Sequence, residues 1–180
     1  MKATGIVRRI DDLGRVVIPK EIRRTMRIRE GDPLEIYTSN DGEVIFKKYS
    51  AINEMSENAS QVSDIMFRLA SCPVIIFDRD HVVAVSGVSK KEFNERRVSP
   101  ELEDLMQSRK NYYAEAGKVN NFIPAEGVDK VAIAAMPIIS SGDITGAVVF
   151  LESDKSKIIT DLQKSLICAA AQFLGKQIEG

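Results

Sequence analysis

Basic side chains crowd the first 29 residues of the chain. This segment holds nine basic and three acidic residues, a surplus of six positive charges in a chain whose formal net charge is -1. Seven of the nine are arginines, whose planar guanidinium group can form paired hydrogen bonds with a phosphate or with the edge of a guanine. The chemistry that this segment favours is therefore non-covalent recognition of a polyanion.

Short elements must position these side chains. Strands are predicted at residues 4–10 and 15–18, which are rich in β-branched residues and are separated by an Asp-Asp-Leu-Gly turn. Pro19 predicts that a short helix over residues 20–27 begins there, because proline lacks the N–H that the first helical position would leave unpaired. Residues 34–38 and 43–48 predict a second strand pair around the hairpin signal Asp-Gly.

The predicted helix would present its basic residues on one face. At about 100° per residue, its four basic side chains fall within one stripe, while Ile22 and Met26 lie on the opposite side. Arg8 and Arg9 alternate along the first strand, so which of them joins this face stays open. A solvated helix face is the alternative interpretation of such a stripe. The candidate nucleic-acid contacts are Arg8, Arg9, Arg15, Lys20, Arg23, Arg24 and Arg27.

The first 50 residues form too small a unit to be stable alone. Four short strands and one small helix bury little apolar area. We therefore expect two chains to associate, and a twofold axis would present a doubled basic surface to the pseudo-twofold symmetry of duplex DNA.

The run LGRVVIPKEIRRT, together with nearly all of residues 1–50, resembles the DNA-binding domain of the AbrB-like transition-state regulators. The resemblance implies a swapped-hairpin fold, in which two chains interleave their strands into one small barrel, and a double-stranded DNA partner. It places the family's arginines at Arg8, Arg15, Arg23 and Arg24, and a Lys or Arg position at Arg9. The long C-terminal part is similar to that of a family member expected to repress or activate genes during spore formation.

A helix of about two turns lacks the paired-helix scaffold of a helix-turn-helix motif. We therefore expect arginines from loop, strand and helix to contact phosphates and to respond to DNA shape, with few base contacts. A degenerate sequence preference and a strong dependence on salt follow from this expectation.

Residues 51–70 predict a linking helix. Its apolar residues recur at steps of three and four from Ile52 to Leu69, which fits either a coiled-coil seam or a helix packed on its own sheet. The last helix has two apolar stripes, one ending at Phe173 and one at Ile178. A helix that is apolar on two sides needs two partners, so we expect a homotetramer built through these C-terminal helices.

Between these helices, strands are predicted at residues 73–77, 82–86, 131–137 and 145–151, and helices at 90–96 and 101–108, with a loop over 111–122. This order resembles a GAF domain, and PIISSGDITGAVVFLES is similar to that family's late hairpin. The fold class is therefore α+β: a dimeric swapped-hairpin β-barrel (1–50), a linking helix (51–70) and a GAF-like α/β domain (71–180). The resemblance implies a small-molecule effector of unknown identity, bound between the sheet and the helix-and-loop side. Its candidate contacts, for which simple loop packing is the alternative, are Tyr112, Tyr113, Asn120, Asn121 and Phe122.

Other functions find little support in the sequence. Cys72 and Cys168 have apolar neighbours and no CxxC spacing, and His81 lies at a predicted turn, so we expect no metal site, no cofactor and no enzyme activity. No signal peptide or membrane span is apparent, which predicts a cytoplasmic protein. An antitoxin would combine the same N-terminal fold with a disordered tail that wraps a protein partner, and it remains the alternative function.

Overall fold

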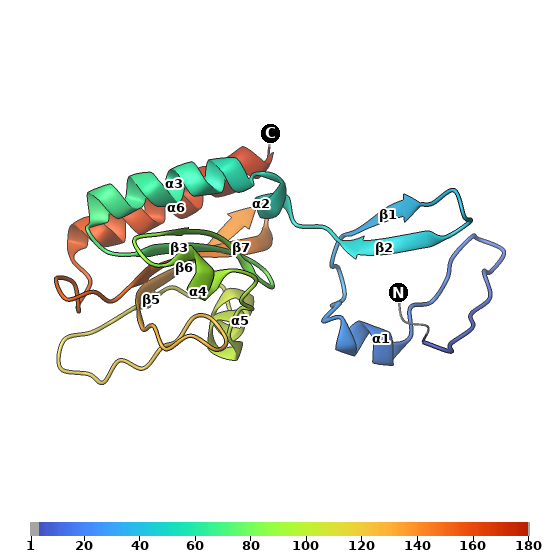
Figure 1. Ribbon diagram of the computed structural model, residues 1–180, viewed down its shortest axis with the longest axis horizontal. Helices are drawn as coiled ribbons and strands as arrows, with labels where there is room; N and C mark the ends of the chain where they lie inside the picture. The colour runs from blue at the N-terminus through green and yellow to red at the C-terminus, as the bar shows by residue number, and fades with distance from the viewer. Residues whose placement is uncertain (1–3, 180) are drawn as a thin grey trace. The chain divides into compact units, whose positions relative to one another are not determined.

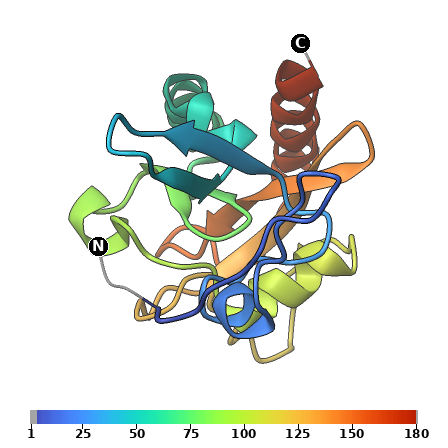
Figure 2. The same cartoon turned by 90° about the vertical axis from the view of Figure 1, so that its right-hand side faces the viewer.

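The computed structural model describes residues 4–179 (Figures 1 and 2). The chain divides into two compact units, Met1–Tyr49 and Ser50–Gly180. The first unit contains a short helix and one hairpin. The second contains a five-stranded sheet with helices on both faces. No helix within residues 4–179 combines the length and the apolar character that crossing a membrane requires.

The first unit consists of α1 (Lys20–Thr25) and the antiparallel strands β1 (Leu34–Thr38) and β2 (Val44–Lys48). The hairpin expected from its Asp-Gly pair is confirmed. The N–H of Ser39 donates to the carbonyl of Glu43 at 3.0 Å, and Gly42 has a φ of 80°, a conformation that glycine adopts without steric cost.

The strands expected at residues 4–10 and 15–18 are absent from the structure, so this prediction is wrong for the single chain. A strand exists only when a neighbouring strand accepts and donates its backbone hydrogen bonds. Between the two segments, one turn closes, in which Asp11 N–H donates to the Arg15 carbonyl and Gly14 N–H to the Asp11 carbonyl, both at 3.0 Å. Beyond that turn the segments find no pairing partner within the described part of their own unit.

The first unit has almost no core of its own. Among residues 4–49, Pro19 alone is buried. Met26, expected to anchor the apolar side of the helix, is 57% exposed. The apolar side chains of this unit thus remain largely in contact with solvent.

The second unit is built from ten elements. In chain order they are α2 (Ala51–Glu54), α3 (Ser56–Ala70), β3 (Val74–Asp78), β4 (Val82–Ser86), α4 (Lys90–Phe93), α5 (Pro100–Gln107), β5 (Tyr112–Tyr113), β6 (Ala132–Ser140), β7 (Asp143–Leu151) and α6 (Asp161–Glu179). The four longer strands confirm the sequence prediction. β5 had been expected to be loop, because two residues are too short to show an alternating pattern.

The five strands form one antiparallel sheet in the order β4-β3-β7-β6-β5. α3 and α6 lie side by side on one face, and α4 and α5 lie against the other (Figure 1). The interior strand β3 alternates between the two layers: Val74 and Ile76 face the α3/α6 core, and Ile75 and Phe77 face the other core. Burial on both faces explains why this strand is continuously apolar.

The helix expected over residues 51–70 is broken in two at Met55. The N–H of Met55 is shared between the carbonyls of Ala51 and Ile52, a tighter turn that ends α2. Of the predicted seam, Ile52 and Ala59 are fully buried against the unit's own sheet, whereas Leu69 is 55% exposed. Most of the seam therefore follows the interpretation of a helix packed on its own sheet.

α6 approaches β6 unusually closely at Gly175. A Cβ atom at this position would lie 2.3 Å from the backbone carbonyl oxygen of Ile139. Glycine is therefore required here by the contact, although it is a poor helix former. The end of the same helix is tied to the β6–β7 turn, where Ser141 N–H donates to the Glu179 carboxylate at 2.8 Å.

We expect Gly175→Ala to lower the free energy of unfolding by about 1 to 3 kcal/mol, because α6 must move away from β6. The matched control is Gln177→Ala, at an exposed position of the same helix, which should change it by less than about 0.5 kcal/mol. Urea denaturation followed by circular dichroism measures both. A stabilised Gly175→Ala variant, as at an open helical site, would contradict the close contact.

Candidate nucleic-acid interface

α1 carries three of the predicted DNA contacts. Lys20, Arg23 and Arg24 lie on this six-residue helix, and all three are exposed. Glu21 in its first turn and the two arginines in its last turn match the helix dipole, with negative charge at the start and positive charge at the end. One short element thus presents three cations to solvent.

Arg27 does not extend this basic face along the helix, as had been expected. α1 ends at Thr25, and Arg27 has a φ of 51°, in the left-handed region. Its carbonyl accepts a hydrogen bond from Lys48 Nζ at 2.9 Å, which connects the end of the helical segment to β2. Arg27 is therefore half-buried beside the hairpin rather than on the exposed stripe.

Arg15 lies at a turn organised by the carboxylate of Asp11. This carboxylate accepts the N–H of Leu13 at 3.0 Å, the N–H of Arg15 at 2.8 Å and Arg15 Nε at 2.8 Å. The Arg15 side chain nevertheless remains 69% exposed. The two backbone bonds hold the loop, and the ion pair turns the guanidinium group toward Asp11.

Arg8 and Arg9 are both exposed in the segment that precedes this turn. Arg8 Nη1 donates to the carbonyl of its neighbour Val7 at 3.2 Å. Because the segment is not a strand, the expected alternation of the two side chains does not apply in the single chain. Which of the two faces DNA therefore stays open.

The five candidates for effector binding separate into two groups. The Tyr112 hydroxyl donates to Asn120 Oδ1 at 2.6 Å, and the rings of Tyr112 and Phe122 are 4.6 Å apart. Asn120 Nδ2 in turn donates to a strand carbonyl, so these side chains satisfy one another. Asn121 is exposed, and Tyr113 lies on the other side of β5.

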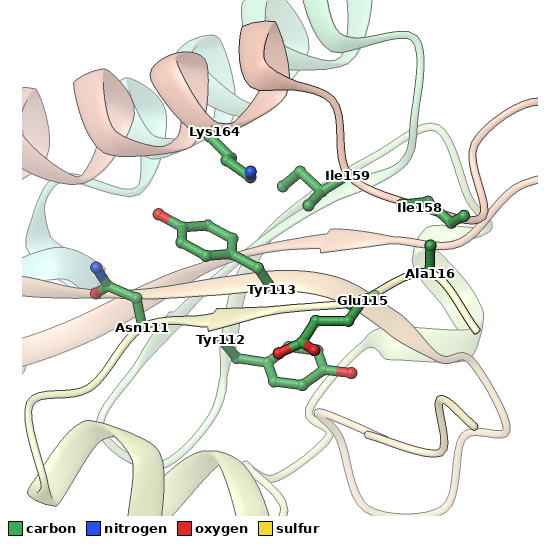
Figure 3. A pocket seen from close by; sticks show the side chains of 9 residues that line it. Asn111, Tyr112, Tyr113, Glu115, Ala116, Ile158, Ile159 and Lys164 are labelled. Carbon is green, nitrogen blue, oxygen red and sulfur yellow. The ribbon is translucent and has the colours of Figure 1, made fainter. Parts of the chain in front are cut away.

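A cavity of about 600 Å³ lies at the β5 edge of the sheet, below the start of α6 (Figure 3). Of the five candidates only Tyr112 and Tyr113 line it. Its further charged residues, Glu115 and Lys164, were missed by the sequence analysis. A single lysine in the first turn of a helix gives no signal that it reaches toward a distant strand.

Titratable groups elsewhere give little sign of chemistry. Burial raises the pKa of the Cys72 thiol to about 12, which disfavours the reactive thiolate. His81 lies at the expected turn, where Asp78 Oδ1 accepts its N–H at 2.6 Å. Within residues 4–179 there is no group of three or more His, Cys, Asp and Glu residues that could hold a metal ion.

Comparison with known proteins follows the division into two units. The family described as "Stage V sporulation protein T C-terminal, transcription factor" matches residues 54–179, and the family "Antidote-toxin recognition MazE, bacterial antitoxin" matches residues 7–52. Stage V sporulation protein T of Bacillus subtilis strain 168 is 46% identical over 179 residues, which cover 99% of this chain and 99% of that protein.

Two further proteins are each similar to one part of the chain. Transition state regulatory protein AbrB of the same organism is 49% identical over 76 residues, or 42% of this chain and 77% of that protein. A GAF domain of a phosphoenolpyruvate-protein phosphotransferase from Coxiella burnetii is 14% identical, with a TM-score of 0.56, over 69% of this chain and 82% of that chain. The resemblances to AbrB-like regulators and to the GAF fold are thus confirmed.

The stability of the turn at Asp11 should depend on pH. Hydrogen bonds from the backbone and then the side chain of Arg15 lower the pKa of Asp11 below its ordinary value of 3.8. A lowered folded pKa means that the turn keeps this stabilisation above about pH 4 and loses it as the pH falls through the lowered value. NMR titration of the Leu13 and Arg15 amides should give a midpoint below 3.8.

The control for this titration is Arg15→Ala, which removes the ion pair and keeps the backbone donor. We expect the midpoint to rise part of the way toward the ordinary value. An unchanged midpoint would show that the guanidinium group does not act on Asp11.

Proposed function

The chain belongs to the stage V sporulation protein T family of transcription factors, and we propose that two copies pair through their N-terminal units to bind duplex DNA. As a member of this family with an AbrB-like N-terminal domain, it is a DNA-binding regulator of sporulation. We propose that it represses or activates transcription by binding degenerate sites. This action requires the protein to be in the cytoplasm, where the DNA is.

The observation that carries the pairing is the exposed apolar surface of the first unit. Val7 is 85% exposed, Ile10 and Val17 are each 71% exposed, and Ile36 and Val44 on the hairpin are 61% and 60% exposed. Apolar side chains at this density in so short a unit are typical of a surface that another chain covers. At about 25 cal/mol per Å² of buried apolar area, a second copy would stabilise both units.

The same pairing would supply the missing strands. Residues 4–10 and 15–18 have the composition of strands, and only a partner for their backbone groups is missing. A swapped-hairpin barrel, in which the segments of two copies interleave, provides such partners. It also avoids the marginal stability of an isolated two-stranded hairpin.

Pairing would also concentrate positive charge. Residues 4–29 of each copy contain eight basic and three acidic side chains. Lys20, Arg23 and Arg24 are already exposed on one helix, and Arg15 is held in a defined direction at its turn. Two copies related by a twofold axis would present this set twice, which suits contact with both strands of a duplex.

The outer surface of the second unit supports a further association. On α6 the stripe formed by Ile167 and Leu174 is fully buried on the sheet, whereas Leu162 and Phe173 on the other stripe are 63% and 50% exposed. On the neighbouring α3, Ile65 is 48% exposed. Because α6 has two apolar stripes, we expect the helices of another copy to cover this surface in a helical bundle. Together with the pairing of the N-terminal units, this contact would give a homotetramer.

We assign the sensing role to the second unit. Its GAF fold has a sheet with helices and loops on the side where the resemblance to GAF domains led us to expect an effector. The side chains of Tyr112, Asn120 and Phe122 fill that side with mutual contacts. A cavity large enough for a small molecule lies instead at the β5 edge.

The antitoxin match to residues 7–52 raises a second candidate, a DNA-binding protein that captures a toxin with its C-terminal part. Such capture uses a tail that folds on its partner. Here residues 50–179 already have two apolar cores, one on each face of a sheet. The folded second unit therefore favours the transcriptional regulator.

DNA affinity should fall by orders of magnitude between about 50 and 200 mM salt if six to ten phosphates are contacted per dimer. Arg23→Ala or Arg24→Ala, each present twice in the dimer, should make the slope of log affinity against log salt shallower by about one to two. Because both residues are exposed, the free energy of unfolding should change by less than about 0.5 kcal/mol. Fluorescence anisotropy and urea denaturation measure the two quantities.

Lys130→Ala is the matched control, since it removes one exposed cation from the second unit. It should leave both affinity and slope unchanged. Equal loss of affinity in the control and in the α1 variants, or an affinity that is flat with salt, would reject the proposed surface.

If the protein is a homotetramer, light scattering in dilute solution should give the mass of four chains. Replacing Leu162 and Phe173 together by Gln should reduce the particle to two chains, because the outer stripe of α6 loses its apolar character. Val119→Gln, at a loop position that is 92% exposed, is the control and should leave the mass unchanged. A wild-type protein that remains a single chain would overturn both proposed contacts.

A further inference from the structure

The cavity at the β5 edge combines a polar end and an apolar end. Its walls come from β5 and the residues after it, and from the segment that leads into α6 (Figure 3). Lys164 reaches from α6 toward the ring of Tyr113, with its Nζ atom 5.8 Å from the ring centroid. Two elements far apart in the sequence therefore converge on one space.

The polar end is rich in hydrogen-bond donors. The hydroxyl of Tyr113 points toward the side on which Asn111 lies (Figure 3), and it makes no hydrogen bond within the part of the chain that the structure describes. Burial raises the pKa of Tyr113 above its ordinary value of 10.0, so the hydroxyl keeps its proton and can donate. The ammonium group of Lys164 and the amide of Asn111 add further donors.

Lys164 is available to a ligand. It forms an ion pair with Asp161, one turn earlier on α6, at 3.3 Å, and the Asp161 side chain is 99% exposed. Exposed ion pairs of this kind contribute about 0 to 1 kcal/mol and exchange easily. A buried or bidentate partner would have held the ammonium group away from the cavity.

The other charged residue of the cavity is also held in an exposed ion pair. Glu115 forms an ion pair with Lys118 on its own loop, at 2.5 Å. Figure 3 shows the Glu115 carboxylate beside Tyr112 and the Lys164 ammonium group beside Tyr113, so the charge on the Tyr113 side of the cavity is positive.

The apolar end lies along the chain that enters α6. Ile159 is 8% exposed and forms part of the core, whereas Ile158 is 49% exposed although it lines the cavity. Figure 3 shows Ile159 next to Lys164 and Ile158 farther along, beside Ala116. An apolar chain lying there would cover Ile158 and would gain the free energy of burial.

We propose that this cavity binds a small organic anion in which a carboxylate is joined to a short apolar chain. The carboxylate accepts hydrogen bonds from Lys164, Tyr113 and Asn111, and the chain lies against Ile159 and Ile158. This proposal rests on the sensing role that we assigned to the second unit, and it adds the chemical class of the ligand. It connects the ligand to α6, the helix whose outer stripe would join two copies.

The test compares six-carbon probes on the full-length protein by isothermal titration calorimetry without DNA. Hexanoate should bind about tenfold or more tightly than hexylamine, which has the same chain and the opposite charge. Lys164→Gln should weaken hexanoate binding about tenfold or more, and Tyr113→Phe should weaken it by a smaller factor. Lys130→Gln, which removes an exposed cation elsewhere in the same unit, should bind hexanoate like the wild type.

Binding of norleucine distinguishes a free amino acid from a simple monocarboxylate as the ligand. It shares the chain and the carboxylate of hexanoate and adds an ammonium group. Tighter binding of norleucine that is lost in Glu115→Gln would support a free amino acid, and weaker binding would support a simple monocarboxylate. Both outcomes retain the proposed site.

Three results would overturn the site: no binding of hexanoate or norleucine, equal binding of hexanoate and hexylamine, or an unchanged affinity in a folded Lys164→Gln variant. A melting curve verifies the fold of each variant. Because DNA is absent from the measurement, failure here would leave the proposed DNA-binding surface intact, and loss of DNA binding would leave this site intact.

Discussion

The first unit cannot bury its own apolar side chains. Within residues 4–49 only Pro19 is a buried residue, while several valines and isoleucines on the N-terminal segment and on the hairpin stay exposed. For so short a chain, hydrophobic burial is the main term that can offset the loss of conformational entropy. In the proposed dimer, the same step that completes the core would also gather the arginines. Folding, assembly and DNA recognition would then share one physical origin.

Local signals in the sequence were reliable where a few neighbouring residues decide the structure. Asp41-Gly42 marked the β1–β2 hairpin, Pro19 marked the start of α1, and the apolar run at residues 73–77 marked the strand β3. The segments 4–10 and 15–18 failed because strand pairing is not a local property. β-branched residues favour an extended backbone, but the ladder requires a partner that the single chain does not provide.

The candidate sites differ in the same way. Helical periodicity predicts that the basic residues of α1 share one face, and Lys20, Arg23 and Arg24 are exposed on this helix. Arg27 lies outside the helix, which ends two residues before it. The cavity could not be placed from sequence. It depends on the contact between an edge strand and a helix that lie about fifty residues apart, and neither Tyr113 nor Lys164 belongs to a recognisable motif.

The contact of Gly175 with the Ile139 carbonyl limits how the second unit can move. A helix whose backbone touches the strand beneath it has no layer of side chains on which to slide. Together with the bond from Ser141 to Glu179, it fastens the far half of α6 to the sheet. A conformational change passed between subunits through this helix would then rotate α6 and the sheet together as one rigid body.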